Sequence, residues 1–139
     1  MFYKFKTKPY GHQLIALEKS SNKKVYALFM EMGTGKTKVL LDNLGTLRCQ
    51  NLINGALIIA PKSVYTVWYH TEIPKHLNVE YDMLMWKSTL REAKLREFFE
   101  KPSIKLKLFI MNVEAFSSDK GSFWAEEFCK RHTNLIAVD

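Results

Sequence analysis

FMEMGTGKT, residues 29–37, is the stretch on which the predicted fold depends. The apolar residues that lead into it, Val25–Met30, are typical of a buried strand. After it, Leu40, Leu44 and Leu47 recur at i, i+4 and i+7, which is the spacing of one helical face. A strand, a glycine-containing loop that ends in Gly-Lys-Thr, and a helix together form the context of a phosphate-binding loop.

The residue types in this loop suit a bound triphosphate. Gly33 and Gly35 allow backbone conformations in which successive N–H groups turn toward an anion. The following helix would present its first N–H groups and the positive end of its dipole to the same phosphates. Lys36 would supply a cation for the β- and γ-phosphates, and the Thr37 hydroxyl would bind Mg²⁺. The strict motif begins with glycine where this chain has Met30, so a glycine turn that opens an ordinary helix is the alternative.

The composition is that of a single soluble globular domain. The chain has 139 residues, of which 47% are hydrophobic and 25% are charged. A formal net charge of +7 suits a polyanionic partner such as nucleic acid, although a solvated lysine-rich surface gives the same balance. Cys49 and Cys129 lack metal-ligand spacing, which fits a reduced intracellular chain. With no membrane-span or signal-peptide pattern, we expect a cytoplasmic location, in a host cell if the source is viral.

Predicted strands and helices alternate along the chain. This alternation predicts an α/β fold, with a parallel sheet covered by helices on both faces, in one domain spanning residues 1–139. Pro74 is expected to end or bend one helix, and Pro102 to end the next. Strands are predicted at 55–61, from a continuous apolar run, and at 78–86, from an imperfect alternation. Further strands are predicted at 106–111 and 135–139, with a short edge strand at 1–8. Helices are predicted at 12–19, 64–71, 89–101 (with a capping box formed by Thr89 and Glu92) and 122–131.

Right-handed crossovers would bring the ends of these strands to one carboxyl edge of the sheet, where α/β proteins bind ligands. Four side chains that suit phosphate or metal binding lie at or just beyond strand ends expected to share this edge. They are Lys36, Ser63, Asn112 and Asp139.

Several motifs together resemble a known family. The chain contains His12-Gln13, the EMGTGKT loop, Ile58–Ser63 followed by Trp68, Ile110–Glu114, and Leu135–Asp139, in that order. This combination resembles the first RecA-like lobe of superfamily-two helicases, most closely the Swi/Snf-like DNA translocase branch. The resemblance covers nearly the whole chain, and its most specific parts are the glycine loop and the Ala-Pro-Lys-Ser segment.

The resemblance implies a role for each motif. Gln13 would hydrogen-bond adenine, although a glutamine on a helix surface is the alternative. ATP would be bound by Gln13 together with Met32, Gly33, Thr34, Gly35, Lys36 and Thr37, and Mg²⁺ by Thr37 and Asp139. Lys36 and Asp139 would be the catalytic residues. Lys62, Ser63 and Asn112 would contact the backbone of DNA, although Ser63 is equally suited to capping a helix.

Two further expectations concern the rest of the site. Trp68 is expected in the core rather than in a base-stacking platform, because it lies on the apolar face of its predicted helix. In the resembled family, the acid matched by Asp139 is followed by a glutamate that positions the attacking water, and a second lobe supplies arginines.

We therefore expect this sequence to be part of a longer motor protein. Alone, the fragment would bind nucleotide weakly and hydrolyse it negligibly. The alternatives are a P-loop kinase and a non-catalytic, basic nucleic-acid-binding module whose Gly-Lys-Thr loop is vestigial.

Overall fold

A parallel β-sheet forms the centre of the molecule. The computed structural model describes residues 25–29 and 36–138, with side chains described from residue 40 to residue 137. Within this part of the chain, five strands run in the order β1-β5-β2-β4-β3, and every neighbouring pair is parallel. The α/β class and the parallel sheet are thus confirmed. The strands are β1 (Val25–Phe29), β2 (Gly55–Ala60), β3 (Tyr81–Met85), β4 (Leu106–Asn112) and β5 (Asn134–Val138).

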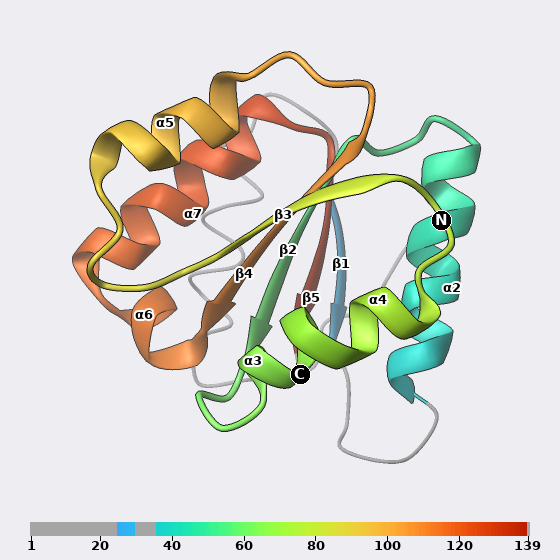
Figure 1. Cartoon of the computed structure of the whole chain (residues 1–139), viewed down its shortest axis with the longest axis horizontal. Helices are drawn as coiled ribbons and strands as arrows, with labels where there is room; N and C mark the ends of the chain where they lie inside the picture. Colours follow the sequence, from blue (N-terminus) through green and yellow to red (C-terminus); the bar gives the residue numbers. More distant parts are fainter. Residues whose placement is uncertain (1–24, 30–35, 139) are drawn as a thin grey trace.

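Helices cover both faces of this sheet. Helix α2 and the α3–η1–α4 segment lie on one side, and α5, α6 and α7 lie on the other (Figure 1). The predicted elements at residues 1–8 and 12–19 lie outside the described residues. The helices are α2 (Lys36–Cys49), α3 (Tyr65–Val67), the π-helical turn η1 (Trp68–Glu72), α4 (Ile73–His76), α5 (Glu92–Glu100), α6 (Val113–Ser117) and α7 (Asp119–Arg131).

The central strands are buried on both faces, as their continuous apolar sequence predicts. Every residue of β2 and β4 is buried. Because successive side chains of a strand point to opposite faces, Ala56 and Ile58 pack beneath α2, whereas Leu57 and Ile59 pack with the aromatic side chains of α5 and α7. Two cores, separated by the sheet, therefore hold the helices in place.

The helix predicted at residues 64–71 differs from expectation. Trp68 is buried as predicted, but Val67 and Thr71, which lie near it on an ideal α-helix, are exposed. The reason is the π-helical turn, in which the Ile73 N–H bonds to the Trp68 carbonyl and two residues five positions apart, Trp68 and Ile73, are both buried. The helix does not end at Pro74, because the helical backbone continues from η1 through Pro74 to His76 as α4.

Of the two predictions about the ends of α5, the one for its start is wrong and the one for its end is confirmed. The predicted capping box is wrong, because α5 begins at Glu92, its N-cap is Arg91, and no side chain caps it. The predicted cap position lies instead in a turn closed by the bond from the Leu90 N–H to the Lys87 carbonyl. The predicted stop is confirmed: Lys101 is extended, with φ −62° and ψ 122°, as expected of the residue before a proline.

Candidate functional site

The carboxyl ends of the strands align as predicted. Phe29 at the end of β1 pairs with Val138 at the end of β5, and Val138 in turn pairs with Ile59 in β2. At the next position, Ala60 pairs with Asn112 of β4. The backbone therefore brings together the strand that precedes the glycine loop, the strand that precedes Asp139, and two of the strands whose ends carry candidate nucleic-acid residues.

Helix α2 begins at Lys36, directly after the glycine-containing segment 30–35. Its first turn contains no acidic residue, whereas α5, α6 and α7 carry Glu92, Glu114 and Asp119 in theirs. An acid in the first turn interacts favourably with the positive end of a helix dipole. In α2, the positive end of the dipole is instead left to interact with a ligand or with solvent. Buried leucines of the helix, including Leu40 and Leu44, hold it against the sheet.

Several predicted site residues fall outside what the structure describes. Lys36 and Thr37 are the first two residues of α2, but their side chains are not described. Their roles in binding phosphate and metal stay predictions. The same holds for the predicted residues that lie wholly outside the described part of the chain, namely Gln13, Met32, Gly33, Thr34, Gly35 and Asp139.

Lys62 and Ser63 are both exposed, in the turn that follows β2. The Pro61 carbonyl closes this turn by accepting the N–H groups of Val64 and Tyr65, at 2.9 and 3.0 Å. Val64 is the N-cap of α3, and no side chain caps this helix, so the alternative role of Ser63 as a helix cap is wrong. The Ser63 hydroxyl therefore remains available for the predicted phosphate contact.

Asn112 has a structural role that the sequence reading did not assign. Its side-chain oxygen accepts the Ala115 N–H at 2.6 Å and caps α6, and only 9% of the residue is exposed. A capping oxygen satisfies one of the helix's unpaired N–H groups, so that oxygen is already occupied. Contact of Asn112 with a nucleic acid stays a prediction, and the structure favours its capping role.

Hydrogen bonds join three separate segments near the end of β3. The Tyr65 hydroxyl, from α3, donates to the Trp86 carbonyl at 3.2 Å. Lys120, from the first turn of α7, donates to the Ser88 carbonyl at 3.1 Å, and its ammonium group lies 5.8 Å from the centre of the Trp86 ring. These contacts fix the loop that contains the exposed cation Lys87. The sequence alone did not predict this arrangement, because it depends on three segments that are far apart in the chain.

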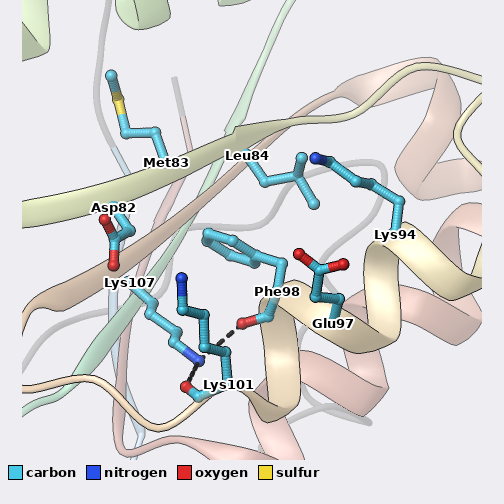
Figure 2. A pocket seen from close by; sticks show the side chains of 8 residues that line it. All are labelled: Asp82, Met83, Leu84, Lys94, Glu97, Phe98, Lys101 and Lys107. Carbon is cyan, nitrogen blue, oxygen red and sulfur yellow. Dashed lines mark hydrogen bonds between the residues drawn. The ribbon is translucent and has the colours of Figure 1, made fainter.

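Lys107 is a second residue that the sequence reading missed. Although it is a lysine, it is only 6% exposed. Its ammonium group donates to the carbonyls of Phe98 (2.7 Å) and Lys101 (2.5 Å) at the end of α5, as Figure 2 shows, and to that of Phe99 (3.3 Å). It thereby supplies a cation to the negative end of the helix dipole. Burial lowers the pKa of Lys107, and the nearby Asp82 carboxylate partly offsets this effect.

Comparisons with known proteins leave the family open. No model of a known protein family matches the chain, and no curated protein matches it significantly in sequence. Among the described residues, no group of three or more His, Cys, Asp and Glu side chains is arranged to hold a metal ion. None of the helices in the described part of the chain is long and apolar enough to cross a membrane.

Proposed function

We propose that the chain is the ATP-binding, RecA-like lobe of an ATP-dependent DNA helicase or translocase. In the full-length protein, ATP and Mg²⁺ would bind between this lobe and a second one, and hydrolysis would drive movement along duplex DNA. The observation that carries the proposal is the pairing of β1 with β5 in register from Val25–Asn134 to Phe29–Val138. Neighbouring parallel strands thus lead directly into the Gly-Lys-Thr segment and into Asp139.

This pairing matters because triphosphate chemistry needs two groups at the same phosphates: a cationic side chain, and a metal ion held by a carboxylate. Residue 30 and Asp139 each follow directly from paired residues, Phe29 and Val138. The chain then re-enters regular structure at Lys36, in a helix whose first turn lacks an acid. These features support a nucleotide at the carboxyl edge, held by residues 32–37 and by a metal ion on Thr37 and Asp139.

The same edge supports a nucleic-acid partner. Lys62 and Ser63 are exposed beyond β2, which lies directly beside β5. A lysine and a hydroxyl suit contact with backbone phosphates, which gives affinity without reading sequence. The net charge of +7 has the sign that such a partner needs.

Calorimetry with ATP and Mg²⁺ tests the proposal. We expect weak but saturable binding that Lys36→Ala reduces about 10- to 100-fold, the usual range for one charge-assisted contact. Lys75→Ala, which removes an exposed lysine from α4, is the charge-matched control and should leave nucleotide affinity unchanged.

Two results would favour the rival functions. Transfer of phosphate to a small-molecule acceptor would indicate a kinase. DNA binding without any nucleotide binding, unchanged in Lys36→Ala, would indicate a basic module with a vestigial loop.

A further inference from the structure

A small hollow at the opposite, amino edge of the sheet is lined by basic side chains. It has a volume of about 190 Å³ and lies between the loops that precede β2, β4 and β5. Its ionisable lining consists of Lys101, Lys105, Lys107, Arg131 and His132, with no carboxylate among the lining residues. We call these five residues, with the polar Asn54 and Ser103, the basic hollow.

Some of this positive charge is already matched by neighbouring groups. Lys107 donates to the carbonyls at the end of α5, as described above. Arg131 lies 3.5 Å from Glu100 and 3.4 Å from Glu127, measured between nitrogen and carboxylate oxygen. Because α5 and α7 both end at this edge, their negative dipole ends offset further positive charge.

The charges of two lysines in the basic hollow are not matched in this way. Lys101 and Lys105 are exposed, and no hydrogen bond or ion pair involves either ammonium group within the described part of the chain. The Asp82 carboxylate accepts a hydrogen bond from the Ser103 hydroxyl at 3.3 Å and lies outside the lining of the hollow. Lys101 also repels Lys107, whose pKa its charge helps to lower after the larger effect of burial.

The loop that carries these lysines is held in place. Arg48 from α2 donates to the Ile53 carbonyl at 3.3 Å and to the Ile104 carbonyl, which ties the loop before β4 to the loop before β2. The Lys105 N–H donates to the Ser103 hydroxyl at 3.0 Å. An anion entering the hollow would therefore meet a fixed backbone and would relieve the repulsion between like charges.

We propose that the basic hollow binds a phosphate group, at the edge of the sheet opposite the glycine loop. The phosphate belongs either to a free phosphate compound or to a nucleic-acid backbone. Both present negatively charged phosphate oxygens to the lysines, with up to two charges on a free phosphate and one on each backbone phosphodiester. This site is independent of the proposed nucleotide site, since none of its residues lies at the carboxyl edge.

Amide chemical shifts of the whole chain, titrated with inorganic phosphate, test this proposal. We expect saturable shifts at residues 101, 103–105 and 131–133. The double variant Lys101→Ala/Lys105→Ala should weaken this binding about tenfold, roughly threefold for each exposed lysine. The matched control, Lys75→Ala/Lys94→Ala, removes the same charge from exposed sites outside the hollow and should keep the wild-type affinity.

A short DNA duplex then separates the two sources of phosphate. Displacement of inorganic phosphate by the duplex assigns the hollow to a nucleic-acid backbone, and lack of displacement assigns it to a free phosphate compound. The absence of saturable shifts, or an equal loss of affinity in the control, would overturn the proposal. Lys36→Ala should leave these shifts intact, so failure at one edge is distinguishable from failure at the other.

Discussion

Gly121 and Gly45 are both helical, and the structure predicts opposite effects when each is changed to alanine. At Gly121, in α7, a Cβ would lie 1.8 Å from the Ala115 carbonyl oxygen and 2.5 Å from its carbonyl carbon. At Gly45, in α2, the nearest atoms to a Cβ would be side-chain carbons of Leu77 and Val79, at 3.8 and 3.9 Å. The first environment is a clash with backbone, whereas the second is ordinary van der Waals contact.

The magnitudes follow from what has to move. The clashing atoms at Gly121 are backbone, so no rotamer change relieves the overlap and α6 must separate from α7. The same movement disturbs Ser118, whose hydroxyl donates to the Ala115 carbonyl at 2.6 Å and accepts the Gly121 N–H at 3.0 Å. Overpacking costs about 1–3 kcal/mol and a lost cap about 1 kcal/mol, against a gain of up to about 1 kcal/mol in helix propensity. Gly121→Ala should therefore destabilise by about 1–3 kcal/mol.

Gly45→Ala should instead stabilise by about 0.5–1 kcal/mol, because only the propensity term remains. Urea unfolding, followed by circular dichroism, measures both free energies of unfolding. For a chain of this size, the Gly121 variant should also melt about 3–12 °C below the wild type. Unchanged stability in Gly121→Ala would refute the close packing of α6 on α7. A comparable loss in Gly45→Ala would refute the ordinary van der Waals contact described for Gly45 in α2.

Three other predictions concern side chains of known burial. Lys107→Met should lower the free energy of unfolding by about 1.5–3 kcal/mol in urea titrations, since the end of α5 loses its charged donor; an unaltered midpoint would show that these contacts are not formed in solution. Asn112→Ala should cost about 1 kcal/mol and Asn112→Asp much less, because aspartate retains a capping oxygen; equal losses would contradict the capping role. Cys49 should react with a thiol reagent at once and Cys129 only at the rate of opening, because Cys49 is exposed and burial raises the pKa of the Cys129 thiol to about 12. Because that pKa lies above the unfolded value of 9.0, the stability contributed by the neutral Cys129 thiol is complete below pH 9 and falls between pH 9 and pH 12. Unfolding free energies of wild type and Cys129→Ala, measured across this alkaline range, should therefore differ in their pH dependence. Parallel curves would exclude this contribution of the thiol.

Long apolar patterns made most of the fold predictable. β2 is a continuous apolar run and β4 is apolar except for Lys107 and Asn112, and such segments indicate strands covered on both faces. The leucines of α2 are spaced at helical intervals and are buried as that spacing predicts. The alternation of these elements predicted that the strands run parallel and that their carboxyl ends share one edge of the sheet.

Short and irregular features were not predictable by periodicity. The π-helical turn shifts the buried positions to Trp68 and Ile73, five residues apart, and no α-helical template contains that spacing. Helix α6 has only five residues, too few for a periodic signal, although Asn112 followed by Glu114 is a visible helix-start pattern. The role of Lys107 depends on where α5 ends in space, which sequence spacing along β4 does not encode.

For the candidate site, the sequence predicted the backbone arrangement better than the duties of individual side chains. The strand ends that carry the candidates are aligned, as the pairs Phe29–Val138 and Ala60–Asn112 show. The side-chain oxygen of Asn112, however, accepts the Ala115 N–H and caps α6, a role that depends on the helix that follows.

The most direct test of the proposed function is a double-mutant cycle at the two ends of the nucleotide site. Lys36→Ala, Asp139→Asn and the combined variant would be titrated with ATP at increasing Mg²⁺ concentrations. If both residues act on one bound nucleotide, the effects on binding free energy are non-additive, and Asp139→Asn removes most of the dependence on Mg²⁺. Strictly additive effects, with the same Mg²⁺ dependence in wild type and Asp139→Asn, would contradict a shared nucleotide site.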